Sequence, residues 1–153
     1  NNKNVAPSSI YNPILGSLAP QTQTADHHIL REAACQALAR FSDLPESERL
    51  IQPLGKVVKE DSHEEVRLAC ARALSRFYKD AAGATTELVA ALNSELERGP
   101  QADNVTVATA IIRSLGSLRD RRSFVPLMRV IQSRFPTSTK REAQRALENI
   151  KWD

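Results

Sequence analysis

LREAACQALARF, residues 30–41, is the stretch that decides the fold, because related phrases of the same length recur three times further along the chain. The other copies are VRLACARALSRF, VATAIIRSLGSL and TKREAQRALENI, which span residues 66–77, 107–118 and 139–150. Their matching leucines are 36, 41 and 32 residues apart, at Leu38, Leu74, Leu115 and Leu147. A repeat of this length indicates helical units that stack side by side, because one unit alone cannot bury its apolar face.

Each phrase has the apolar spacing of a helix that packs on one side. In the first copy we expect one buried stripe, formed by Leu30, Ala34, Ala37, Leu38 and Phe41. A further helix is predicted before each copy, over residues 9–18, 47–60, 85–98 and 123–135. Short connectors require consecutive helices to lie antiparallel. The sequence therefore predicts an all-α fold in which eight helices form four hairpins.

One domain accounts for nearly the whole chain. We expect residues 1–7 to be a disordered tail and residues 8–153 to be a single repeat domain, because no strand pattern or second domain competes. The longest connector inside the array is predicted at residues 99–104, which would explain the 41-residue spacing. Ser62 and Thr139 each stand three residues before a glutamate and are the expected caps of their helices.

Two stretches resemble HEAT-like repeats, most closely the short type also found in phycobilisome bilin lyases. Residues 113–131 contain Leu-Gly, then Asp120, then Val-Pro, and residues 61–74 read DSHEEVRLACARAL. The resemblance covers residues 26–150 and implies a right-handed α-α superhelix, a HEAT-like solenoid. The arginine of the repeated second helix is present as Arg31 and Arg67, but the third and fourth units depart from the pattern with Ala108 and Lys140.

The resemblance also implies where a partner would bind, because the second helix of each hairpin lines the concave side of such arrays. The positions opposite the apolar stripe carry a series of arginines, which we name the arginine ridge: Arg40, Arg72, Arg76, Arg113, Arg141 and Arg145. The planar guanidinium group suits carboxylates and phosphates. The alternative interpretation is a solvated face that binds nothing, because helix surfaces carry arginines routinely.

Three functions remain open at this stage. The first is a non-catalytic scaffold or adaptor that binds another protein through the concave face, and the arginines there favour a partner with an acidic surface. The second is nucleic-acid binding, because residues 105–153 carry a net charge of +6 whereas residues 1–104 carry −3. Aromatic residues, at 5%, are too scarce to favour base stacking. The third is an enzyme of the bilin lyase type, although no acid/base constellation for one is visible.

Neither a metal site nor a cofactor site is predicted, and we expect no enzyme activity. His27, His28 and His63 are the only histidines, and no cysteine or acidic cluster completes a ligand set around them. HEAT-like deoxyhypusine hydroxylases bind iron through repeated His-Glu pairs, of which this chain has one. We expect Cys35 and Cys70 to be reduced core thiols, and a bond between neighbouring helices is the alternative.

The remaining expectations concern membrane insertion, oligomeric state and cellular compartment. No stretch approaches the roughly 18 consecutive apolar residues of a membrane span. We expect a monomer, or weak end-to-end association through an apolar end that contains Ile150 and Trp152. The sequence does not assign a compartment, and we favour the cytoplasm.

Overall fold

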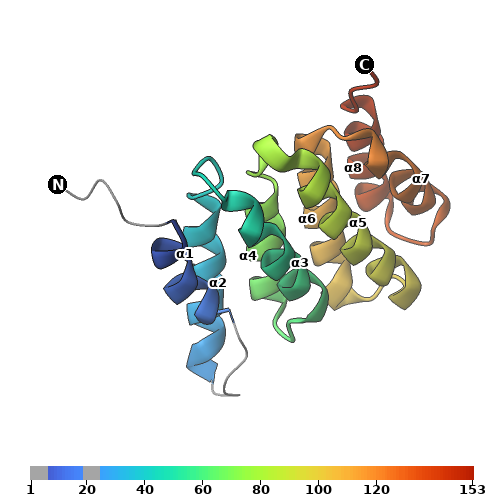
Figure 1. The fold of residues 1–153 in the computed structure, drawn as a ribbon. Helices are drawn as coiled ribbons and strands as arrows, with labels where there is room; N and C mark the ends of the chain where they lie inside the picture. Colours follow the sequence, from blue (N-terminus) through green and yellow to red (C-terminus); the bar gives the residue numbers. More distant parts are fainter. Residues whose placement is uncertain (1–6, 19–24) are drawn as a thin grey trace.

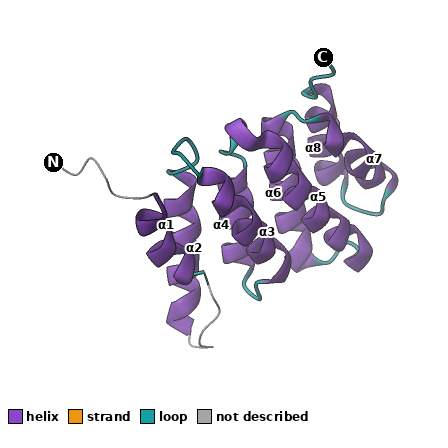
Figure 2. Cartoon of the chain, viewed as in Figure 1, coloured by secondary structure: helices purple, strands orange, loops and turns teal. Residues whose placement is uncertain are grey.

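The fold is a stack of helical hairpins, seen in a computed structural model that describes residues 7–18 and 25–153 (Figure 1). The described residues contain helices and connecting loops but no strand (Figure 2). The α-helices are α1 (Pro7–Gly16), α2 (Ala25–Ala39), α3 (Ile51–Glu60), α4 (Glu64–Leu74), α5 (Ala81–Arg98), α6 (Ala102–Leu118), α7 (Phe124–Gln132) and α8 (Thr137–Glu148). Short 3-10 helices, η1 (Ser47–Leu50), η2 (Tyr78–Asp80) and η3 (Arg121–Ser123), lead into α3, α5 and α7.

The helices form two layers. The first helices of the hairpins, α3, α5 and α7, pack on one another in sequence, and the second helices α2, α4, α6 and α8 do the same (Figure 1). Helix α1 packs on α2. This arrangement confirms the predicted all-α solenoid of four hairpins. Of the predicted tail, residues 1–6 lie outside the described residues, and Pro7 is the first residue of α1.

One elongated core runs through the stack. The repeated leucines Leu38, Leu74 and Leu115 are fully or almost fully buried, and the fourth, Leu147, is partly buried against the same core. The predicted stripe of the first copy is wrong at Leu30, which is 54% exposed, and Ala37 and Phe41 are only partly buried. Its counterparts in α4 and α6 are completely buried between neighbouring hairpins, whereas α2 belongs to the first hairpin and has a hairpin on only one side.

The long spacing of the third unit comes from its helices rather than from a connector. Helix α6 begins at Ala102, so only residues 99–101 separate it from α5, and the predicted connector over residues 99–104 is wrong. Asn104 tightens this turn, because its side chain accepts from the Gln101 amide at 2.7 Å and donates to the Gly99 carbonyl at 2.6 Å. The 41-residue spacing reflects α5 and α6, which have 18 and 17 residues where α3 and α4 have 10 and 11.

The predicted helix caps at Ser62 and Thr139 are also wrong. Helix α4 begins at Glu64 with His63 at the capping position, and no side chain caps it there. Thr139 lies inside the first turn of α8, is buried, and faces the Thr109 hydroxyl of α6 at 3.2 Å. Thr139 therefore joins α8 to α6 and does not cap its own helix.

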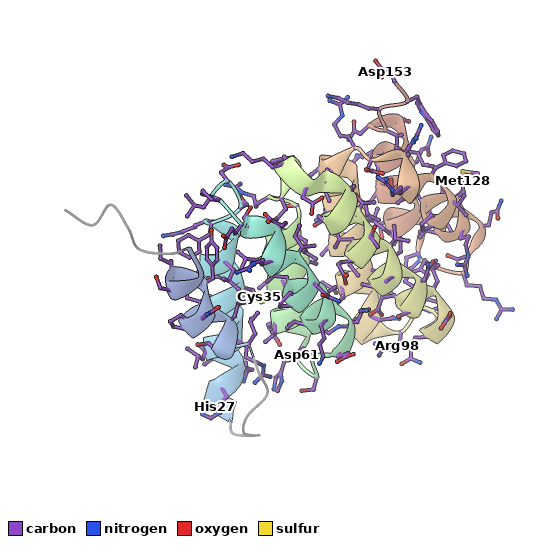
Figure 3. The ribbon with its side chains drawn as sticks, viewed as in Figure 1. His27, Cys35, Asp61, Arg98, Met128 and Asp153 are labelled. Carbon is purple, nitrogen blue, oxygen red and sulfur yellow. A yellow bond between two sulfur atoms is a disulfide. The ribbon has the colours of Figure 1, made fainter. Side chains whose placement is uncertain are left out.

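A disulfide joins the first two hairpins. Cys35 of α2, labelled in Figure 3, is bonded to Cys70 of α4. Their Cα atoms are 4.9 Å apart, which lies in the ordinary range for disulfides. Both cysteines are completely buried. The expectation of two reduced thiols is therefore wrong, and the bond between neighbouring helices, the alternative, is present. Disulfides persist mainly in oxidising compartments, which weighs against the cytoplasm favoured above.

Two buried ion pairs continue this linkage along the array. The Nε and Nη2 atoms of Arg31 in α2 donate to the two carboxylate oxygens of Asp61, at 2.7 and 3.2 Å, in the turn after α3. Arg67 in α4 pairs with Glu95 of α5, and its Nε also donates to the Val58 carbonyl at 2.8 Å. These arginines point into the structure, so they lie apart from the arginine ridge. No helix among the described residues is long and apolar enough to cross a membrane.

Candidate functional site

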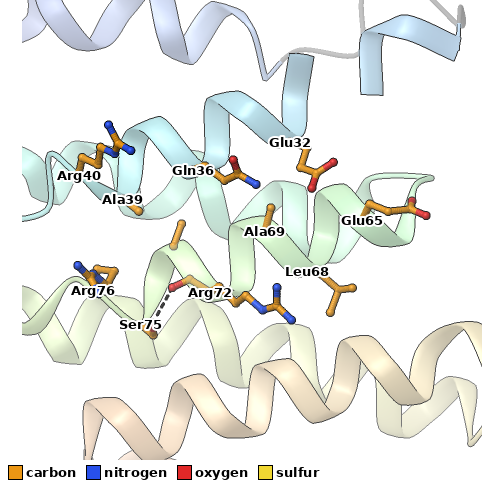
Figure 4. Close-up of a pocket in the computed structure, with 11 residues that line it drawn as sticks. Glu32, Gln36, Ala39, Arg40, Glu65, Leu68, Ala69, Arg72, Ser75 and Arg76 are labelled. Carbon is orange, nitrogen blue, oxygen red and sulfur yellow. Dashed lines mark hydrogen bonds between the residues drawn. The ribbon is translucent and has the colours of Figure 1, made fainter. Parts of the chain in front are cut away.

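The main hollow on the face formed by the second helices lies between α2 and α4. We name it the α2–α4 groove, and its cavity volume is about 500 Å³ (Figure 4). Its lining consists of Glu32, Gln36, Ala39, Arg40, Glu65, Leu68, Ala69, Arg72, Ala73, Ser75 and Arg76. Half of the predicted arginine ridge, Arg40, Arg72 and Arg76, therefore meets around one groove.

The groove exists because the facing residues of α2 and α4 are small. Ala39, Ala69 and Ala73 line it, and the disulfide holds the two helices together beneath it. Long side chains stand on either side of this small-residue floor, and all three groove arginines are exposed. Sequence and packing together thus produce a shallow channel with charged walls.

A smaller hollow of about 130 Å³ continues this face between α4 and α6. It is lined by Arg72, Ser75, Ala110, Arg113, Ser114 and Ser117. Arg72 borders both hollows and so connects them. The Ser114 hydroxyl donates to the Ala71 carbonyl at 2.9 Å, which fixes α6 against α4 at the base of the second hollow.

The six arginines of the ridge differ in their partners. Arg113 and Arg145 both contact the same Glu142 carboxylate oxygen, each at 3.2 Å. Among the described residues, Arg40, Arg72, Arg76 and Arg141 have no ion-pair partner. Arg141 and Arg145 line neither hollow. The structure therefore brings three of the four arginines that lack an ion-pair partner among the described residues to the α2–α4 groove.

Sequence reasoning selected only the arginines and overlooked the acidic end of the groove. Glu65 was assigned only to the helix cap that begins at Ser62, and Glu32 was left out of the predicted partner-binding residues. Glu65 lies in the first turn of α4 and Glu32 in the middle of α2, whereas Arg40 and Arg76 follow the ends of the same helices. That shared order of charge in two successive units was the signal available in the sequence.

A second cavity lies on the opposite layer, between α1 and α3. Its volume is about 540 Å³, and Leu15, Leu18, Pro53 and Val57 give it an apolar character. The buried Arg31–Asp61 pair borders it, but that arginine is already satisfied. This cavity therefore has no arginine without an ion-pair partner in its lining, and it is more apolar than the α2–α4 groove.

The exposed aromatic residues at the last hairpin form a separate small patch. Trp152 is 61% exposed and packs edge-on against Phe124, with ring centroids 5.4 Å apart. Ile150, which we grouped with Trp152 as an apolar end, is instead buried. The expectation of weak end-to-end association then depends on the two aromatic rings and stays a prediction.

The histidines do not lie in either hollow of the second-helix face. His28 and His63 stack face to face with ring centroids 4.5 Å apart, and the Nδ1 atom of His63 lies 3.3 Å from Arg31 Nη2. Among the described residues, no group of three or more histidine, cysteine, aspartate or glutamate side chains could hold a metal ion. The α2–α4 groove itself is lined by carboxylate, amide, hydroxyl and guanidinium groups and by aliphatic side chains.

Comparison with known protein families agrees with this architecture. Residues 17–102 match the HEAT repeat family, and the match covers more than half of the chain. The chain belongs to the HEAT repeat family. The matched HEAT segment contains α2, α3, α4 and α5, and therefore the whole α2–α4 groove, the disulfide and both buried ion pairs. HEAT repeats generally mediate protein interactions and are typically non-catalytic. No curated protein matches the sequence.

Proposed function

We propose that this HEAT-repeat chain is a non-catalytic scaffold or adaptor that binds an acidic surface of another protein in the α2–α4 groove. The observation that carries the proposal is the gathering of Arg40, Arg72 and Arg76 around one groove without ion-pair partners among the described residues. Three exposed like charges repel one another, and carboxylates from a partner would relieve that repulsion. A guanidinium can also bind a carboxylate through two parallel hydrogen bonds.

The basic residues of the C-terminal half support nucleic-acid binding less well. Several of them are engaged within the protein: Arg119 Nε donates to the Asn149 carbonyl at 2.9 Å, Arg122 pairs with Asp120 at 2.9 Å, and Arg129 donates to Asn93 at 2.9 Å. These side chains line neither hollow of the second-helix face. A phosphate backbone needs a continuous row of available cations, so the net charge of this half overstates what it offers to DNA or RNA.

The test compares three forms of the chain as bait in extracts of the source organism. The first is the wild type, and the second is Arg40→Glu/Arg72→Glu/Arg76→Glu. The third is a control with the same change of charge at exposed positions outside both hollows, Arg121→Glu/Arg134→Glu/Lys151→Glu. Circular dichroism establishes that all three are folded.

We expect the wild type and the control to retain the same partner and the groove variant to lose it. Each charge-assisted hydrogen bond contributes about 1.5–3 kcal/mol, so losing several should lower the affinity at least tenfold. Equal capture by the groove variant would refute the proposal. Fluorescence anisotropy with labelled duplex DNA forms the second arm, and binding that only the Arg121/Arg134/Lys151 control loses would assign the surface to nucleic acid instead.

A further inference from the structure

The charges of the α2–α4 groove are ordered from one end to the other. Glu32 and Glu65 lie at one end, whereas Arg40 and Arg76 lie at the other, and Arg72 extends between them (Figure 4). Among the described residues, neither glutamate has an ion-pair partner. The groove therefore presents separated negative and positive ends rather than a uniformly basic surface.

This order is a consequence of the repeat. Helices α2 and α4 are the second helices of successive hairpins, so they run in the same direction. In α4 this order agrees with the helix dipole, because Glu65 lies in the first turn and Arg72 in the last, whereas Glu32 is the middle residue of α2. Since each helix carries its glutamate before its arginine, the glutamates of the two helices meet at one end of the groove and Arg40 and Arg76 meet at the other.

The length of the groove sets the spacing that a ligand must have. Glu32 and Arg40 are eight positions apart in and just after α2, which corresponds to about 12 Å along a helix axis. An extended peptide covers this distance in about four residues. Leu68, Ala69 and Ala73 line the stretch between the ends, where small uncharged residues of a ligand would fit.

We propose that the groove binds an extended segment of a partner protein with opposite charges at its two ends. One or two aspartates or glutamates would contact Arg40, Arg72 and Arg76, and a lysine or arginine about four residues away would contact Glu32 and Glu65. This inference rests on the proposed function and adds the charge pattern of the partner. Like charges placed opposite the two glutamates are disfavoured, so a wholly acidic segment would bind less well.

The experiment uses the full chain and three labelled peptides at physiological salt. The bipolar peptide has two aspartates at one end, a lysine about four residues away and alanine or serine between them. In the acidic peptide a glutamate replaces the lysine, and in the neutral peptide serines replace all the charged residues. Fluorescence anisotropy measures the Kd of each peptide for the wild type, for Glu32→Lys/Glu65→Lys, and for Glu97→Lys/Glu148→Lys, which has the same change of charge at exposed sites outside the groove.

We expect the wild type and the Glu97/Glu148 variant to bind the bipolar peptide about tenfold more tightly than the acidic one, which is the effect of one favourable charge contact. The Glu32/Glu65 variant should reverse this preference. Equal affinity for the two peptides in the wild type, or no binding of either, would overturn the inference. If acidic and bipolar peptides bind equally and Arg40→Glu/Arg72→Glu/Arg76→Glu loses both, the proposed function stands and only the charge pattern fails.

Discussion

The disulfide between α2 and α4 should contribute a large share of the stability of the chain. We consider the double variant Cys35→Ala/Cys70→Ala, which replaces both buried sulfurs by small apolar side chains. The bond closes a loop with a sequence separation of 35 residues. The chain-entropy relation for such a loop gives about 4 kcal/mol at 25 °C. A typical domain has a free energy of unfolding of about 5–15 kcal/mol, so the loss is a substantial part of the total.

Urea unfolding followed by circular dichroism measures this contribution. The oxidised wild type is compared with the wild type in reducing agent and with the double variant. With a slope of about 2 kcal/mol per molar urea, a loss of about 4 kcal/mol lowers the midpoint by about 2 M. Reducing agent should lower the midpoint of the wild type and leave that of the double variant unchanged, which separates the effect of the bond from that of the substitutions.

Two results would refute this reasoning. The first is a pair of thiols that react with Ellman's reagent in the denatured, unreduced protein, because then no disulfide exists. The second is a wild-type midpoint that is the same with and without reducing agent. If the bond is present, its loss should also weaken binding in the α2–α4 groove, since α2 and α4 form the two walls.

Three further predictions concern packing and charge. Arg67→Met should cost about 3 kcal/mol in urea unfolding, because it removes the buried partner of Glu95 and leaves this carboxylate only the partly exposed Arg98, at 3.5 Å; a loss below 1 kcal/mol would contradict a buried pair. Gly116→Val should lower the free energy of unfolding by about 1–3 kcal/mol, because even a Cβ at this position would lie 3.2 Å from the Cβ of Ala146 and 3.3 Å from its Cα; an unchanged Tm would contradict that close approach of α6 and α8. Burial of Tyr11, assisted by two nearby glutamates, raises its pKa above the ordinary value of 10.0. The folded state therefore favours the neutral phenol, whose stabilisation is complete below pH 10 and is lost as the pH rises through the higher folded pKa, so unfolding measured against pH should show an alkaline loss that Tyr11→Phe lacks.

The fold was predictable because its determinant is local and repeated. The second helices bury equivalent leucines against their neighbours, so the spacing of Leu38, Leu74 and Leu115 already indicates stacked hairpins. The start of α6 was predicted wrongly because asparagine is common in loops and also in first turns of helices. The hydrogen bonds from Asn104 to the turn at residues 99–101 decide between these roles, and they depend on geometry that the sequence pattern does not contain.

The candidate site was predictable in part for the same reason. Repeat offsets place the arginines on second helices, but they do not show that Glu142 engages Arg113 and Arg145 while Arg40, Arg72 and Arg76 stay without ion-pair partners among the described residues. That distinction depends on how α6 and α8 lie against each other. The disulfide could not be predicted from the repeat register either, because Cys35 and Cys70 differ by one position in it. Only the packing of α2 against α4 brings the two cysteines together.

The location of the strongest inter-hairpin links has a mechanical consequence. The disulfide and the two buried ion pairs all connect elements between α2 and α5, whereas α6 and α8 meet through Gly116 and Ala146, a pair of threonine hydroxyls and an ion pair between Glu142 and the exposed Arg113. Bending the array at the last junction would displace small side chains and one solvent-accessible ion pair, whereas bending it near the groove would strain a covalent bond and two buried ion pairs. We therefore expect the solenoid to resist bending most strongly around the α2–α4 groove and to bend most easily at its last hairpin.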